Sequence, residues 1–78
     1  MDSEKKIFKL ISNILEIPEN LLSEDTAIGD FPKWDSINQL LIISELENEF
    51  NIKLDPEDIM EMEDISDIID IIEEYTSK

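Results

Sequence analysis

The 78-residue sequence contains no cysteine, no histidine and no arginine. Without His and Cys, the chain cannot build a Ser/His/Asp or Cys/His nucleophile, a thiolate or imidazole metal site, or a disulfide. We therefore do not expect an enzyme, although weak binding of divalent cations by the many carboxylates remains open. The lack of Cys also agrees with a reducing, cytoplasmic location.

Long apolar runs are missing as well. The longest one, Leu40–Ile43, is far shorter than the ~20 residues that span a bilayer. The sequence begins Met1-Asp2-Ser3-Glu4, and this charge is wrong for the start of a signal peptide. We expect a soluble protein without a membrane span.

Positive charge is scarce: six Lys stand against 21 Asp and Glu, which gives a net charge of −15. Binding to nucleic acid is not expected, because it needs clustered basic side chains. From Trp34 to Ser77 the chain carries 14 acidic residues and one base, Lys53, so partners with basic surfaces are expected there. High charge can signal disorder, but hydrophobic residues make up 41% of the chain. Their periodic spacing indicates a folded chain. We expect it to be one domain over residues 1–78 and a monomer.

The spacing of the apolar residues predicts an all-α fold. The first helix is expected over roughly residues 3–16, with Ser3 as its N-cap. The second is expected from Asp35 or Ser36 to about Phe50. A short third helix begins at Pro56 with Asp55 as its cap. Ile65 begins the stripe of a fourth helix. The predicted architecture is a small four-helix bundle of three main helices and one short one.

Residues 17–34 break the helical pattern with turn-forming residues, among them Pro18, Gly29 and Pro32. This segment is predicted to be a long loop between the first and second helices, and loops of this length are often functional. Four apolar side chains are expected to hold it against the core: Leu21, Leu22, Ile28 and Phe31.

The second helix has apolar residues on two opposite faces. At about 100° per residue, one stripe is expected to face the core and contains Ile42, Ile43, Leu46 and Phe50. Ile37, Leu40 and Leu41 fall on the opposite side. Either the long loop covers them, or they form an interaction surface with an acidic rim that includes Glu45, Glu47 and Glu49. The exposure of these side chains distinguishes the two hypotheses.

Ser36, at the start of this helix, also has two interpretations. Ser36 and Gln39 match a capping box, in which the serine hydroxyl caps the helix and the glutamine reaches back. Asp35 is an equally good cap, and if it takes that role the hydroxyl of Ser36 is free.

Three segments resemble the acyl carrier proteins: Asp35-Ser36-Ile37 at the start of the second helix, residues 45–52 (ELENEFNI) and residues 54–59 (LDPEDI). The resemblance implies that Ser36 carries 4′-phosphopantetheine, transferred from coenzyme A by a separate phosphopantetheinyl transferase, with Asp35 as part of the motif. The arm ends in a thiol that holds acyl or aminoacyl groups as thioesters. Its phosphodiester would lie at a helix N-terminus, which favours an anion.

The resemblance also implies the partners. They are acyl synthases and acyltransferases with basic docking patches, in fatty-acid synthesis or a related specialised pathway. Beside Asp35, the residues that map onto the family's docking positions are Ile37, Leu40, Leu41, Ser44 and Glu47. Asn38 stands where fatty-acid carriers usually have an acid, and the approach Phe31-Pro32-Lys33-Trp34 looks more like that of carriers dedicated to a specialised pathway.

Two further hypotheses accompany this one. The chain could instead be an unmodified acidic adaptor or inhibitor that docks on a basic partner. If it is a carrier with a plastic core, an acyl chain could enter between the second and third helices, whereas aminoacyl cargo would stay outside. Calcium binding by Asp64, Asp67 and Asp70 is not expected, because their spacing of three differs from that of an EF-hand.

Overall fold

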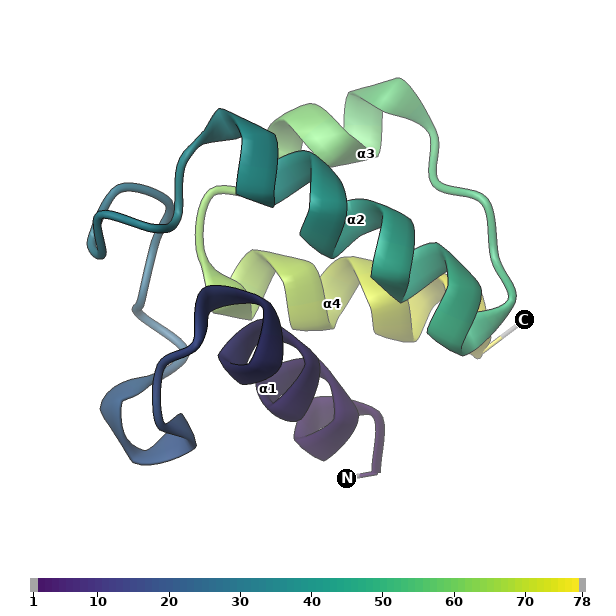
Figure 1. Cartoon of the computed structure of the whole chain (residues 1–78). Coiled ribbons are helices and arrows are strands. Elements are labelled where there is room, and N and C mark those ends of the chain that lie inside the picture. Colours follow the sequence, from purple (N-terminus) through teal and green to yellow (C-terminus); the bar gives the residue numbers. More distant parts are fainter. Residues whose placement is uncertain (1, 78) are drawn as a thin grey trace.

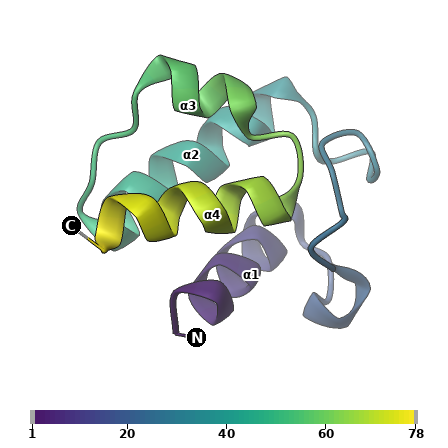
Figure 2. The ribbon, with the colours of Figure 1, turned by 180° about the vertical axis from the view of Figure 1, so that it is seen from behind.

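The computed structural model describes residues 2–77, with side chains from residue 3. Over these residues it contains four α-helices and no strand: α1 (Asp2–Leu15), α2 (Ser36–Phe50), α3 (Pro56–Glu61) and α4 (Ile65–Thr76). A short 3-10 turn, η1 (Glu19–Leu21), follows α1. In Figures 1 and 2, α2 and α4 lie between α1 and the short α3. The predicted all-α bundle with a long first loop is confirmed.

The core is built from the apolar stripes of the three longer helices. Ile7, Ile11 and Leu15 of α1 are fully buried, as are Ile42 and Leu46 of α2. Five isoleucines of α4 complete the core: Ile65, Ile68, Ile69, Ile71 and Ile72. Phe50, which was expected in the core, lies half-buried at its edge. The stripes predicted from helical spacing therefore face the core, as their periodicity required.

The long loop is held less by its side chains than expected. Leu22 is buried and Phe31 packs against the core, but Leu21 and Ile28 are exposed. Main-chain hydrogen bonds attach the loop to the start of α4 instead. The amide of Ile28 donates to the carbonyl of Glu63 (3.1 Å), that of Ile65 to Thr26 (3.0 Å), and that of Ser66 to Glu24 (2.9 Å). The prediction that Leu21 and Ile28 hold the loop is therefore wrong.

The helix starts also differ in part from the sequence-based expectation. Ser3 lies inside α1 and does not cap it, because the helix already includes Asp2. Asp55 precedes α3 but makes no capping hydrogen bond with its side chain. Its amide instead donates to the hydroxyl of Tyr75 in α4 (3.0 Å), and this hydroxyl donates to Asp58 in α3 (2.5 Å). Tyr75 thus ties the start of α3 to α4.

Within residues 2–77, no helix is long and apolar enough to cross a membrane.

Candidate functional site

Ser36 is the first residue of α2, and its side chain is exposed. Asp35 is the N-cap: its backbone is extended (φ −107°, ψ −174°), and its carboxylate accepts a hydrogen bond from the amide of Asn38 at 2.9 Å. No hydrogen bond of the Ser36 hydroxyl is present among the described residues. The second interpretation of the sequence is therefore correct, since Asp35 caps the helix and the serine hydroxyl is not engaged.

Gln39 does not reach back to Ser36, so the predicted capping box is wrong. Its side-chain oxygen accepts a hydrogen bond from the indole N–H of Trp34 at 2.6 Å. Its side-chain nitrogen donates to the carbonyl of Met62, after α3, at 3.5 Å. Trp34 is only 1% exposed, and a buried indole N–H needs an acceptor. Gln39 supplies this acceptor, so its side chain does not bond to Ser36.

The segment before Ser36 is held by its own main chain. The amide of Trp34 donates to the carbonyl of Phe31 at 2.9 Å, and the amide of Gly29 donates to the carbonyl of Trp34 at 3.0 Å. Gly29 has φ of +94°, a conformation that favours glycine. The side-chain amide of Asn38 donates to the carbonyl of Lys33. These hydrogen bonds hold residues 29–34, before the serine, and Asn38, after it, in place.

An ion pair also joins the two ends of the long loop. The ammonium of Lys33 lies 2.6 Å from the carboxylate of Glu16, at the end of α1. The hydrogen bond from Lys33 is the main cause that lowers the pKa of Glu16. The Trp34-Asp35-Ser36 segment is thus tied to α1 as well as to the core.

The electrostatic setting of Ser36 suits a phosphate. Main-chain amides at a helix start lack partners within the helix, and the helix dipole places partial positive charge there. The first turn of α2 contains no acidic residue, and the carboxylate of Asp35, which precedes the helix, is engaged by the amide of Asn38. The residues present therefore fit a phosphodiester on the hydroxyl of Ser36.

An exposed apolar strip runs along α2 from the residue after Ser36. Ile37 is 77% exposed, Leu40 65% and Leu41 46%, so the hypothesis that the loop covers them is wrong. Ser44 is exposed as well. On α3, Met60 is 82% exposed, which the sequence analysis did not foresee, because a six-residue helix gives too short a pattern to assign its faces.

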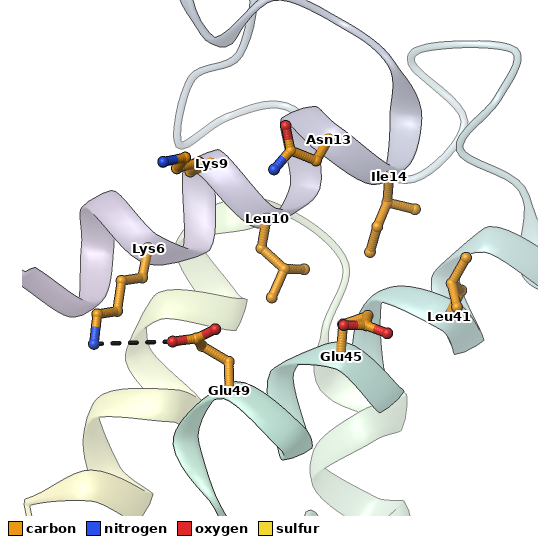
Figure 3. A pocket seen from close by; sticks show the side chains of 8 residues that line it. All are labelled: Lys6, Lys9, Leu10, Asn13, Ile14, Leu41, Glu45 and Glu49. Carbon is orange, nitrogen blue, oxygen red and sulfur yellow. Dashed lines mark ion pairs between the residues drawn. The ribbon is translucent and has the colours of Figure 1, made fainter.

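The acidic residues of α2 are arranged differently from the expected rim. Glu47 is half-buried, and its carboxylate accepts a hydrogen bond from the amide of Leu54 at 2.8 Å. Glu47 thus stabilises the connection between α2 and α3. Glu45 and Glu49 point toward α1, where Glu49 lies 3.9 Å from Lys6 (Figure 3). The apolar strip therefore has fewer free carboxylates beside it than the sequence suggested.

Between residues 2 and 77, no group of three or more acidic residues is arranged to hold a metal ion.

The described part of the chain is thus a small helical bundle that presents Ser36, exposed and with no hydrogen bond of its hydroxyl among the described residues, at the start of α2. Residues 5–72 match the family described as "Phosphopantetheine attachment site". Relatives named acyl carrier protein occur in two strains of Buchnera aphidicola. One, from the subspecies Baizongia pistaciae, is 31% identical over 92% of each chain. The other, from the subspecies Schizaphis graminum, is 32% identical over 96% of this chain and 95% of its own.

The acyl carrier protein of Thermotoga maritima is 28% identical over 87% of this chain and 84% of its own. The chain belongs to the acyl carrier protein family. Its cofactor is accordingly 4′-phosphopantetheine, and it is a carrier and not an enzyme.

Proposed function

We propose that Ser36 bears the 4′-phosphopantetheine arm, and that the protein, as one carrier domain over residues 1–78, presents acyl or aminoacyl thioesters to partner enzymes. The observation that carries the proposal is the free, exposed hydroxyl at the first position of α2, with Asp35 as the cap. Asp35 thus belongs to the site because it caps α2 and leaves the hydroxyl of Ser36 unengaged. When bound, the arm supplies the thiol that forms the thioester, which this chain cannot provide because it has no Cys.

The proposed partners are a phosphopantetheinyl transferase and the acyl synthases or acyltransferases of fatty-acid synthesis or a related specialised pathway. The exposed apolar strip Ile37, Leu40 and Leu41, with Ser44 beside it, is the proposed docking centre. An apolar centre with a polar surrounding is the usual form of such contacts. Glu47 contributes by fixing the connection to α3, and the net charge of −15 favours partners with basic patches. A reducing cytoplasm, which keeps a thiol free, suits this function.

Intact mass spectrometry tests the proposal. The protein is incubated with coenzyme A and a broad-specificity phosphopantetheinyl transferase, and we expect a mass gain of one phosphopantetheine. Ser36→Ala should abolish the gain. Ser77→Ala is the matched control, because Ser77 is an exposed serine at the end of α4, outside the proposed docking centre, and it should be modified like the wild type. No gain, or a gain that persists in Ser36→Ala, contradicts the proposal.

A further inference from the structure

A groove of about 500 Å³ lies between α1 and α2 (Figure 3). It lies on the side of α2 that faces α1, so it is separate from the route between α2 and α3 that the sequence suggested for an acyl chain. Its lining is Lys6, Lys9, Leu10, Asn13 and Ile14 of α1, and Leu41, Glu45 and Glu49 of α2.

The two ends of this groove differ in charge. At one end, the ammonium of Lys6 lies 3.9 Å from the carboxylate of Glu49 (Figure 3). At the other end, Figure 3 shows the carboxylate of Glu45 on the side of the groove where Ile14 and Leu41 lie. Among residues 2–77 no ion pair of Glu45 is present. This end thus combines the apolar side chains of Ile14 and Leu41 with the polar Asn13 and with Glu45, which makes no ion pair with another described residue.

Glu45 is also repelled along its own helix. Glu45 and Glu49 are four residues apart on α2, a spacing at which like charges destabilise a helix. Lys6 offsets the charge of Glu49, and within the described chain no base does the same for Glu45. A bound cation at this end of the groove would offset the charge of Glu45.

The groove is within reach of an arm on Ser36. Leu41 lies about 7.5 Å further along the axis of α2 than Ser36 and about 140° around it. Over a helix of ~5 Å radius, this is a surface path of roughly 14 Å. The extended phosphopantetheine chain is about as long as four to five extended residues, or roughly 15 Å. Its thiol end can therefore lie over Leu41, and a group attached to it can enter the groove.

Resting on the proposed modification of Ser36, we propose that this groove holds an aminoacyl cargo. The apolar side chain of the cargo packs against Leu10, Ile14 and Leu41, and its free ammonium pairs with Glu45. A plain acyl group of the same shape makes only the apolar contacts, and a cargo that ends in a carboxylate is repelled by Glu45. The site thus favours cationic over neutral or anionic cargo.

A pair of matched cargoes tests this inference. The transferase loads the protein from the coenzyme A conjugates of leucine and of 4-methylpentanoic acid, which has the leucine skeleton without the amino group. Intact mass confirms each loading, and amide and methyl NMR shifts are then compared with those of the protein carrying the bare arm. We expect larger changes at Leu10 and Ile14 for the leucyl form. An exposed ion pair implies a ratio of groove occupancy of about 1.5- to 5-fold.

Glu45→Gln keeps the shape of the side chain and removes its charge, so the leucyl shifts should fall to those of the 4-methylpentanoyl form. Glu49→Gln is the matched control, because Glu49 faces Lys6, and it should keep the difference between the cargoes. Equal shifts for both cargoes in the wild type, or leucyl changes found only near Ser36 or at Leu46 and Ile59, overturn the inference. A missing mass gain overturns the proposed modification itself, before any shift is compared.

Discussion

Replacing Gln39 by Ala tests whether this side chain supports the buried Trp34 or caps α2 together with Ser36. In the structure, the side-chain oxygen of Gln39 accepts the indole N–H at 2.6 Å, and Trp34 is 1% exposed. The sequence pattern instead predicts a capping box with Ser36. If Gln39 supports the indole, its contribution to stability depends on Trp34. If it forms the capping box, its contribution depends on Ser36.

The expected loss of stability follows from the burial of the indole. Without Gln39, a buried N–H has no acceptor, which costs about 1–3 kcal/mol. The bond to the carbonyl of Met62, at 3.5 Å, adds little. Alanine is a slightly better helix former than glutamine, which returns a few tenths of a kcal/mol. For a domain of this size, each kcal/mol lowers Tm by about 4–8 °C.

A double-mutant cycle measured by urea and thermal unfolding, followed by circular dichroism, separates the two arrangements. Gln39→Ala should couple to Trp34→Phe by about 1–2 kcal/mol, because the second change removes the donor. Its coupling to Ser36→Ala should be close to zero. Asn48→Ala, at an exposed position of the same helix, should change stability by less than about 0.5 kcal/mol. Coupling to Ser36 in place of Trp34 would refute the reasoning.

Two other predictions concern docking and pH. Leu40 is 65% exposed, so Leu40→Ser should change the free energy of unfolding by less than about 0.5 kcal/mol, but it should raise the KM of the modifying transferase. By comparison, Leu46→Ala in the core should lower the free energy of unfolding by about 2–5 kcal/mol. An unchanged KM would count against the apolar strip as a docking centre. The hydrogen bond to Asp58 raises the pKa of Tyr75 above its ordinary value of 10.0, so this stabilisation is complete below that pH and is lost as pH rises through the raised pKa. Urea unfolding at increasing alkaline pH should show the loss in the wild type, and Tyr75→Phe should lack this component.

The helices and the exposed strip could be predicted because both depend on spacing alone. Isoleucine and leucine recur with the helical period on three segments, and the angular positions along α2 separate a buried stripe from a second apolar face. Ile37 and Leu40 are indeed exposed. The residues of the carrier motif needed no tertiary information either, because Asp35 and Ser36 are neighbours at a helix start.

The contacts between a helix and the segments outside it could not be predicted in this way. Gln39 fits a local capping rule, but the buried indole of Trp34 competes for it. Glu47 fits a solvent-exposed rim, yet it accepts a hydrogen bond from Leu54, seven residues later. Ile28 is apolar but exposed, because the loop is attached through its main chain. In each case a tertiary partner decided between local options of similar energy.

The attachment of the long loop to α4 through main-chain atoms constrains how this part of the molecule can change. Every amino acid except proline offers the same amide and carbonyl, so exchanging an exposed side chain such as Ile28 leaves the bonds between residues 24–28 and residues 63–66 in place. An inserted residue, in contrast, would move each later amide away from its carbonyl. The exposed positions of the segment can therefore change in sequence, whereas its length is fixed.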